Sequence, residues 1–455
     1  MKAEVKKFDG MVVCDESITV RDGTVLAARV YRPSKEGSYP VLYCGSPYQY
    51  DTDHLPDSSL FPWYEVGPLE WYVKDQGYAF VHLDVRGSGH SEGEWDPWRV
   101  EEREDHREVL DWMAAAEWCS GKIGSYGQSY YCMTQWLMAV SGTDKLACLG
   151  AFDGACDYYR HLTYRGGIAN QFFNFWSNLV TMSCATRMDP AAPRRVMRNP
   201  MPDIVAHQTD DEFWRSRSPV WDLGVPVYSI GVWGKRDLHL QGNLDAYNLV
   251  KGDKKLLVIN PDSVIAAHHV FTTIDFHEEY LLPFYNYYLK GDDNGWKEKT
   301  PDVKYWVYGK EQFREDTTWP PSAINGKKSL YLSAGPTGSI SSLNDGRLVA
   351  EKPSGAKQPE SAIVAKGWLK ASHRAIDDVM SEKLGRTMYS HERPKLLNPG
   401  QVYKLDICLT GCAHLFRKGD RIRLDVSNAD SGLTDGQFAS IYHWQKVGTD
   451  TYYHS

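Results

Sequence analysis

Short apolar strands alternate with amphipathic helices along the first third of the chain, and no other feature restricts the fold as much. Apolar runs bounded by turn residues predict strands at residues 25–33, 40–45 and 78–87. Apolar positions at helical spacing predict helices over 69–77, which Gly77 closes, and over 100–118. Strands and helices in this order predict a parallel sheet with helices on both faces, the architecture of an α/β protein.

The alternation pauses after residue 153 and resumes later in the chain. Residues 154–218 mix aromatic residues, Met, Pro and Arg, and we interpret them as a helical cap inserted over the sheet. Strands return at 225–234 and 254–261, and the pattern of 279–291 predicts a closing helix. The predicted α/β core therefore has two parts, residues 1–153 and residues 219–299.

From residue 300 onward the helical pattern stops. Short alternating runs separated by Gly, Pro, Asn and Asp predict strands at 303–309, 328–333, 403–409 and 421–427. Strands at this spacing are typical of an all-β sandwich, so residues 300–455 are predicted to form a separate β-sandwich domain.

Composition and charge exclude several other classes of protein. With 455 residues, of which 42% are hydrophobic and 24% charged, the chain suits a globular protein of two or three domains. A chain of this length builds its core without disulfides or metal. The formal net charge of −8 and the lack of a Lys/Arg cluster argue against a nucleic-acid partner.

Targeting signals and metal-binding patterns are not found in the sequence. The N-terminal residues form no apolar segment typical of a secretory signal, and no apolar run is long enough to predict a membrane span. The nine cysteines are scattered without the paired spacing of a zinc site. These observations predict free thiols in a cytoplasmic protein that contacts no membrane.

The segment IGSYGQSYYCMTQW contains the strongest catalytic pattern. Ser129 follows Gly127 by two residues, after a short apolar strand and before a helix, which is the setting of a nucleophile elbow. Such a turn lifts the hydroxyl clear of the sheet and directs the N–H of Tyr130 at a developing oxyanion. Tyr131 stands where the G-x-S-x-G pattern has its second Gly, and a Gly-x-Ser pair alone also occurs in ordinary strand–helix turns.

Further segments in a fixed order extend this pattern over nearly the whole chain. They are VRDGTVLAARVYRP, GSPYQYD, LDVRGSGHSEGEW, DYYRHLTYRGG, VPVYSIGVWGKRDLHLQGNLDAY, YLKGDDNGW and GCAHLFRKGDRIRLDVSNAD. On these segments the chain resembles the CocE/NonD family of serine hydrolases, which includes cocaine esterase, glutaryl acylase and X-prolyl dipeptidyl peptidase. The resemblance implies an α/β-hydrolase fold with a helical cap and a C-terminal, jelly-roll-like β-sandwich. The chain ends where relatives usually add a further short strand.

The resemblance also implies a set of site residues. The family's elbow usually reads G-x-S-Y-x-G, and here the small residue Cys132 replaces the last Gly. The triad Asp follows a strand that reads GVWGKRD, which indicates Asp237. The second oxyanion donor is a Tyr hydroxyl from the segment SPYQY, which indicates Tyr48 beside the N–H of Tyr130.

The catalytic imidazole is the least defined member of the predicted site. Family members commonly carry GPWxH, or a GP…AH variant, after the next strand, whereas this chain reads LVINPDSVIAAHHVF. His268 follows Ala267 and fits the variant best, with His269 and then His277 as alternatives. Any of the three is also explained as a histidine at a loop or at the edge of the core.

Two other conspicuous groups have ordinary structural explanations. In the segment DVRGSGHSEGE, Asp84 and Arg86 are expected to brace a turn in which the glycines adopt positive φ. The cap side chains more often build a core than line a substrate pocket. These side chains are Phe172, Phe173, Phe175, Trp176, Met182 and Met188.

The sequence thus predicts a serine hydrolase that cleaves a carboxylic ester or amide through an acyl-enzyme on Ser129, with Asp237 and His268. No cofactor or metal is expected; the partner is a small-molecule substrate, and the resemblance favours a homodimer. Two alternatives remain open. One is an acyltransferase, or a cyclase or rearrangement enzyme of secondary metabolism on the same fold. The other is a catalytically inactive hydrolase fold kept as a binding protein.

Overall fold

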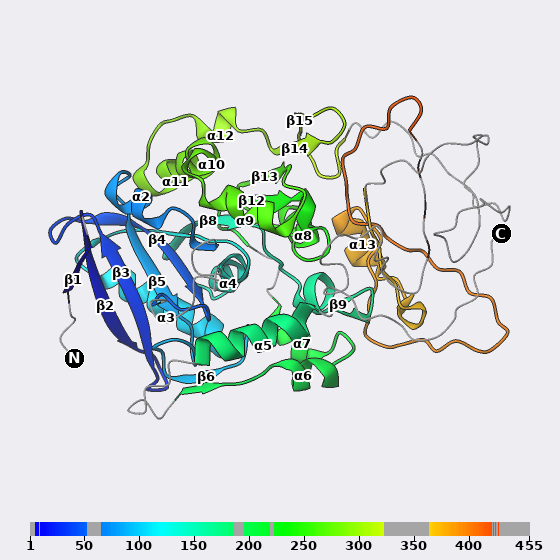
Figure 1. The fold of residues 1–455 in the computed structure, drawn as a ribbon, viewed down its shortest axis with the longest axis horizontal. Coiled ribbons are helices and arrows are strands. Elements are labelled where there is room, and N and C mark those ends of the chain that lie inside the picture. The colour runs from blue at the N-terminus through cyan, green and yellow to red at the C-terminus, as the bar shows by residue number, and fades with distance from the viewer. Residues whose placement is uncertain are drawn as a thin grey trace.

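A large and mostly parallel sheet organises the chain (Figure 1). The computed structural model describes residues 5–8, 10–51, 65–170, 172–185, 195–218, 223–322 and 364–420, with 422, 424 and 426. In these residues, eleven strands lie in the order β1-β2-β3-β5-β4-β7-β8-β12-β13-β14-β15. They are β1 (Val5–Phe8), β2 (Met11–Thr19), β3 (Val25–Arg32), β4 (Tyr39–Ser46), β5 (Ala79–Asp84), β7 (Cys119–Ser125), β8 (Leu146–Phe152), β12 (Val227–Val232), β13 (Lys254–Ile259), β14 (Val303–Val307) and β15 (Gln312–Asp316).

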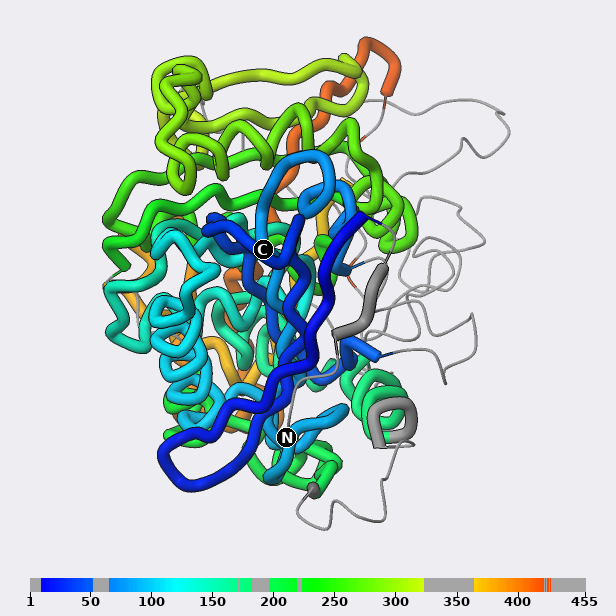
Figure 2. Tube along the Cα trace, turned by 90° about the vertical axis from the view of Figure 1, so that its left-hand side faces the viewer, coloured from blue at the N-terminus to red at the C-terminus, as the bar shows by residue number. Residues whose placement is uncertain are grey.

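The direction of pairing changes only toward the two edges of the sheet. From β5 across to β14 the neighbouring strands are parallel. At the N-terminal edge, β1, β2 and β3 form an antiparallel ribbon that joins β5, and Figure 2 shows β2 and β3 in dark blue. At the other edge β14 and β15 are antiparallel. The predicted α/β fold is confirmed.

Helices cover both faces of the sheet because the side chains of each strand alternate between the faces. In β4, Leu42 packs on one face with side chains from α2 and α11, whereas Val41 packs on the other with side chains from α3 and α8. Helix α4 contributes side chains to both clusters. These helices and the remaining ones of the core are α2 (Leu69–Lys74), α3 (Val100–Ala115), α4 (Tyr130–Ala139), η2 (Trp233–Lys235), α8 (Leu240–Leu249), α9 (Val264–Thr272), α10 (Ile274–Phe276), η3 (His277–Leu281), α11 (Leu282–Tyr285), η4 (Asn286–Lys290) and α12 (Trp296–Lys299).

The segment predicted as a helical cap is only partly helical. It contains η1 (Tyr158–Thr163), α5 (Phe172–Ala185), α6 (Met201–Ala206) and α7 (Glu212–Arg217). It also contains the hairpin β9 (Tyr164–Arg165) and β10 (Ile168–Ala169), and β11 (Arg195–Met197), which pairs in parallel with β6 (Gly93–Trp95). Strands of two or three residues are too short to show a period-2 pattern, so the sequence did not reveal them.

The predicted boundary at residue 300 falls inside the sheet. The first strand assigned to the β-sandwich domain is β14, and it pairs in parallel with β13 instead. An apolar alternating run predicts a strand but does not say which sheet the strand joins.

Of the other three strands predicted for the sandwich, two fall wholly or mostly outside the described residues. Residues 328–333 and most of 421–427 lie outside the described residues. Residues 403–409 form one isolated bridge, between Leu409 and Gly367. The described part of the C-terminal region contains the short helices η5 (Ala371–His373) and α13 (Asp378–Leu384).

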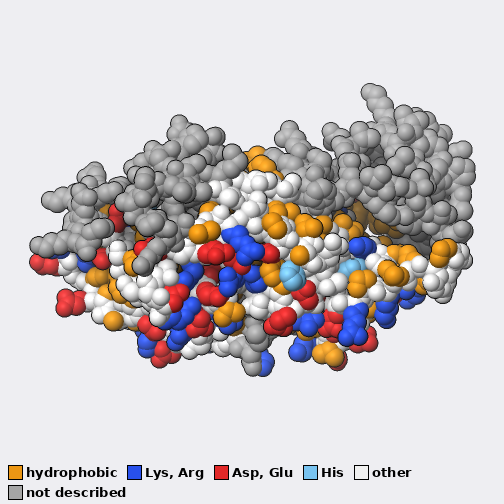
Figure 3. Space-filling view, turned by 90° about the horizontal axis from the view of Figure 1, so that it is seen from below, with side chains coloured by type: hydrophobic (Ala, Val, Ile, Leu, Met, Phe, Trp, Pro, Cys, Tyr) orange, Lys and Arg blue, Asp and Glu red, His pale blue; other side chains and the backbone are white. Residues whose placement is uncertain are grey.

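The charges on one face of the molecule and the apolar length of the helices bear on the kinds of partner the protein can have. Acidic and basic side chains are interspersed on the face shown in Figure 3. None of the helices in the described ranges is long and apolar enough to cross a membrane.

Candidate active site

Ser129 lies in a strained turn between β7 and α4. Its backbone angles are φ 60° and ψ −117°, a left-handed conformation that a residue with a Cβ rarely adopts. The N–H of Ser129 donates to the carbonyl of Asp153 (3.0 Å), and its carbonyl accepts from the N–H of Met133 (2.9 Å). Strain of this kind costs about 1–3 kcal/mol and persists only where the surroundings enforce it. The turn therefore has the form predicted for a nucleophile elbow.

Two glycines make room for this turn. Gly127 has φ +117°, and a Cβ added there would lie 2.4 Å from Cβ of Tyr131. Cys132 stands where the family's elbow usually has its last Gly, and the space it needs is provided by Gly154 after β8. A Cβ on Gly154 would lie 2.5 Å from both Cβ and Sγ of Cys132. The side chain of Cys132 therefore packs against a residue that has no side chain of its own.

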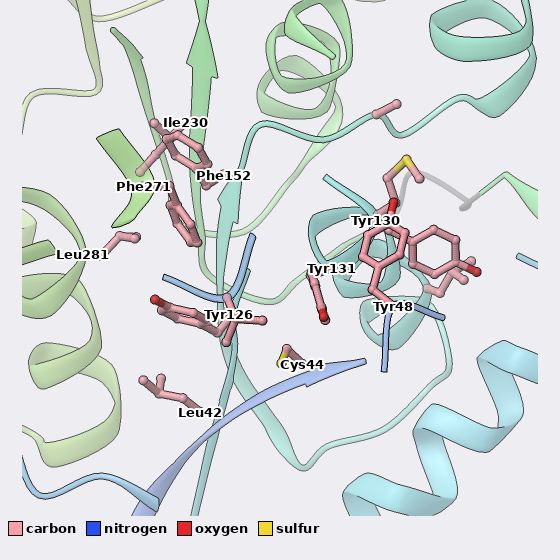
Figure 4. Packing of buried hydrophobic residues seen from close by; sticks show 14 of the residues in the cluster. Leu42, Cys44, Tyr48, Tyr126, Tyr130, Tyr131, Phe152, Ile230, Phe271 and Leu281 are labelled. Carbon is pink, nitrogen blue, oxygen red and sulfur yellow. The ribbon is translucent and has the colours of Figure 1, made fainter. Parts of the chain in front are cut away.

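Both predicted oxyanion donors lie at the elbow. Tyr130 is the first residue of α4, so its N–H has no acceptor within the helix. The ring of Tyr48 packs edge-on against Tyr130 and Tyr131, with ring centroids 6.0 and 5.8 Å apart (Figure 4). The Tyr48 hydroxyl accepts a hydrogen bond from Nε1 of Trp176 in the cap (2.9 Å). A phenol hydroxyl can act both as acceptor and as donor.

The three candidate histidines occupy different environments. His268, on α9, has its Nε2 3.4 Å from Oε1 of Glu65, whereas His269 is exposed. His277 is fully buried; its Nδ1 hydrogen-bonds the Tyr72 hydroxyl (3.0 Å), and its Nε2 hydrogen-bonds the carbonyl of Phe271 (2.7 Å). Burial lowers the pKa of His277 to about 3. The contacts of His277 are therefore those of a structural histidine.

Asp237 follows β12 and the short helix η2, in the chain order Ser…Asp…His. Its Oδ2 lies 3.3 Å from Nζ of Lys366, which belongs to the C-terminal region. Its Oδ1 is buried and makes no hydrogen bond within the described part of the chain. The structure thus places Glu65 beside His268, and one oxygen of Asp237 in an ion pair with Lys366.

A buried group of charged side chains behind the elbow was not predicted. Asp153 accepts from Nε2 of Gln128 (2.8 Å) and lies 3.0 Å from Nζ of Lys235 and 3.2 Å from Nδ1 of His239. Burial alone would raise the pKa of Asp153, but the charges of Lys235 and His239 hold it well below its usual value. The position of Asp153 at the carboxyl end of β8, next to the elbow strand, was a usable signal, because ligand sites of parallel sheets gather at that edge.

Glu65 belongs to the same site and had no signal in the sequence. Its carbonyl accepts the N–H of Gln128 (3.0 Å), its Oε1 lies 3.4 Å from Nε2 of His268, and its side chain is 1% exposed. Burial raises the pKa of Glu65 well above its usual value, against the opposing charge of Lys235. Burial also lowers the pKa of His268, and the positive charge of Lys235 adds to this effect.

The segment DVRGSGHSEGE is structural, as predicted. Asp84 accepts backbone N–H groups from Tyr50 (2.9 Å) and His90 (2.7 Å), and Arg86 forms an ion pair with Asp105 (2.6 Å). Gly87 has φ +73°.

Two remaining predictions concern metal ligands and the aromatic side chains of the cap. Within the described ranges, no cluster of three or more His, Cys, Asp or Glu side chains has the geometry to hold a metal ion. Phe173 and Trp176 are buried in the cap and Phe175 is exposed, whereas Met188 lies outside the described residues.

Comparison with protein families identifies the chain. The model of the X-Pro dipeptidyl-peptidase (S15) family matches residues 22–263, more than half of the sequence. The chain belongs to this family. The C-terminal non-catalytic domain of X-Pro dipeptidyl-peptidase matches residues 347–436 of this S15 protein. The resemblance to CocE/NonD hydrolases is confirmed, with an α/β-hydrolase core followed by that C-terminal domain.

Curated relatives of this S15 protein carry the names of esterases. It is 26% identical to cocaine esterase of Rhodococcus sp. (strain MB1 Bresler) over 362 residues, which cover 68% of this chain and 60% of the relative. It is 23% identical to a putative serine esterase of Mycobacterium bovis over 72% of this chain and 64% of the relative. The alignments therefore span less than two thirds of the length of these relatives.

Solved structures agree with the fold. A CocE/NonD family hydrolase from Staphylococcus aureus matches with a TM-score of 0.73 and 21% identity, over 90% of this chain and 84% of that one. An α-amino acid ester hydrolase matches with a TM-score of 0.52 and 18% identity, over 72% of this chain and 62% of that one. At these identities the likeness shows the fold alone.

Proposed function

We propose that the protein is a serine hydrolase that cleaves a carboxylic ester or amide through an acyl-enzyme on Ser129. The observation that carries this proposal is the left-handed backbone of Ser129 at the end of β7. A residue with a Cβ is held in that strain of about 1–3 kcal/mol at sites where its side chain must project from the sheet. Membership of the S15 family and the esterase relatives support the same reaction.

We infer the following roles for the site residues. Oγ of Ser129 attacks the carbonyl carbon, and His268 accepts the proton and later returns it to the leaving group. The N–H of Tyr130 and the hydroxyl of Tyr48 stabilise the oxyanion. Asp237 orients the imidazole as it becomes charged; its buried Oδ1, which makes no hydrogen bond in the described part of the chain, is suited to accept from a ring N–H. Water then releases the acid.

A fluorophosphonate probe tests this proposal, because it modifies only a serine whose hydroxyl is activated. We expect covalent labelling of the wild-type chain at Ser129, and hydrolysis of p-nitrophenyl acetate to acetate. Ser129→Ala should abolish both, a loss of at least about 10³-fold, because the nucleophile is gone. The matched control is Ser141→Ala: Ser141 bonds the Met138 carbonyl just after α4, and this variant should keep both activities.

The products distinguish the alternatives. Release of free acid supports hydrolysis, whereas a new ester or a cyclic product without free acid supports acyl transfer or cyclisation. A folded wild-type chain that is neither labelled nor active refutes the proposal and favours a binding protein on this fold.

A further inference from the structure

Residues 366–370 of the C-terminal region are held against the hairpin of β9 and β10 in the cap. The N–H of Lys370 donates to the carbonyl of Gly166, which lies in the turn of this hairpin (2.7 Å). The guanidinium of Arg165 lies over the ring of Trp368, 4.7 Å from its centroid. A Cβ added to Gly166 would lie 2.0 Å from the carbonyl oxygen of Trp368, so the two backbones are in close contact.

The backbone of Lys366, at the start of this segment, is fixed by a second set of contacts. Its carbonyl accepts the N–H of Thr410 (2.7 Å), and the next residue, Gly367, forms an antiparallel bridge with Leu409. A lysine side chain is a charge on a long and flexible stem, so its position depends on where the backbone is held. These contacts bring the ammonium group of Lys366 to Asp237.

Lys366 contacts one oxygen of the carboxyl group that the proposed function assigns to the triad. Its Nζ donates a hydrogen bond to Oδ2 of Asp237 (3.3 Å), and the two side chains are only 12% and 20% exposed. The other oxygen, Oδ1, is buried and makes no hydrogen bond to any residue that the structure describes. The terminal torsion of an Asp side chain has a broad energy profile, so a bond to one oxygen restricts the direction of the other.

The loop before Asp237 is held from the cap as well. Nη1 of Arg165 donates to the carbonyl of Arg236 (2.6 Å), while the same guanidinium lies over the ring of Trp368. Arg165 thus links the loop that carries Asp237 to the segment that carries Lys366. A change confined to the side chain of Lys366 leaves this link in place.

We propose that Lys366 is a positioning residue of the active site, through which the C-terminal region orients the triad carboxylate. The inference rests on the role of Asp237 in the proposed function and adds the group that orients it. Because Lys366 fixes Oδ2, Oδ1 stays directed at the ring N–H of the imidazole, which becomes charged when it takes the proton of Ser129. Lys366 acts through Asp237 and transfers no proton itself.

Lys366→Met tests this role, because Met has a similar length but neither a charge nor an N–H donor. We expect kcat for p-nitrophenyl acetate and the rate of fluorophosphonate labelling to fall about 10- to 100-fold, the scale of losing a partner that orients a functional side chain. KM should change less than twofold, because Lys366 orients Asp237 and does not bind the substrate. Lys366→Arg restores a cationic donor and should keep kcat within threefold of wild type.

The matched control is Lys370→Met. Lys370 is an exposed lysine of the same segment, and it contacts the hairpin through its backbone N–H. This variant should keep kcat, KM and the labelling rate of the wild-type chain. Thermal unfolding of each variant shows whether a lower rate reflects less folded protein, and Lys366→Gln replaces Lys366→Met in every comparison if the latter does not fold.

The decisive comparison repeats Lys366→Met in a chain that carries Asp237→Asn. If Lys366 acts through Asp237, the second change should lower kcat less than twofold in that background, since the two residues then act as a unit. An equal fall in both backgrounds overturns the inference, because it shows that Lys366 affects the rate without Asp237.

Two other results also overturn the positioning role. One is a folded Lys366→Met chain with kcat within twofold of wild type, and the other is an Asp237→Asn chain that keeps kcat within threefold, since Lys366 then has no triad carboxylate to orient. In both cases labelling of the wild-type chain at Ser129 leaves the serine-hydrolase proposal standing. A wild-type chain that is neither labelled nor active overturns both proposals.

Discussion

Replacing Tyr48 by Phe separates two roles of one hydroxyl. In the structure this hydroxyl accepts from Nε1 of Trp176 (2.9 Å), while the ring packs against Tyr130 and Tyr131. Phe keeps the ring and its packing and removes only the oxygen. The variant therefore loses the proposed oxyanion donor and leaves the indole N–H of Trp176 without this acceptor.

The two losses have different sizes and appear in different assays. Loss of one oxyanion donor lowers kcat about 10²- to 10³-fold, or about 2.7–4 kcal/mol of transition-state stabilisation. A buried N–H left without an acceptor costs about 1–3 kcal/mol of folding free energy. We expect kcat for p-nitrophenyl acetate to fall by the first amount with KM little changed, and urea unfolding to show the second.

Tyr164→Phe is the matched control for Tyr48→Phe. The Tyr164 hydroxyl is buried in the cap and donates to the carbonyl of Ile204 (2.7 Å), so its removal should lower stability and leave kcat unchanged. If Tyr48→Phe keeps kcat within threefold of wild type, Tyr48 is not an oxyanion donor and the reasoning is wrong. A loss of kcat in Tyr164→Phe of similar size would show that cap stability, rather than the hydroxyl of Tyr48, controls the rate.

Two further predictions follow from the elbow and its surroundings. Gly154→Ala should lower the free energy of unfolding by about 1–3 kcal/mol, because its Cβ would lie 2.5 Å from Cys132. The double variant Gly154→Ala/Cys132→Gly should recover most of that loss in urea unfolding, and no recovery would contradict the packing argument. Burial, and then the charge of Lys235, lower the pKa of His268, whereas Asp153 opposes the shift and His239 and His269 add to it. Since a base must be neutral to accept a proton, the acid limb of kcat/KM against pH should have its midpoint below 6.5, and a midpoint at or above 6.5 would refute this assignment.

Local signals were enough for much of the core. The strands at residues 40–45 and 225–234 and the helix at 100–118 form close to their predicted limits. Their apolar spacing reflects which face of each element is buried, and that spacing is already present in the chain. Ser129 was predicted in the same way, since a strand, a tight turn and a helix follow one another within a few residues.

The sequence by itself determined the order of strands and helices, the position of the elbow and the family, because each depends on residues close together in the chain or on motifs in a fixed order. Tertiary structure alone decided that β14 joins the main sheet, that Gly154 faces Cys132, and that Glu65 lies beside His268. These are contacts between distant segments. Burial, which changes the protonation of a carboxyl group, is a property of the folded surroundings and has no pattern in the chain.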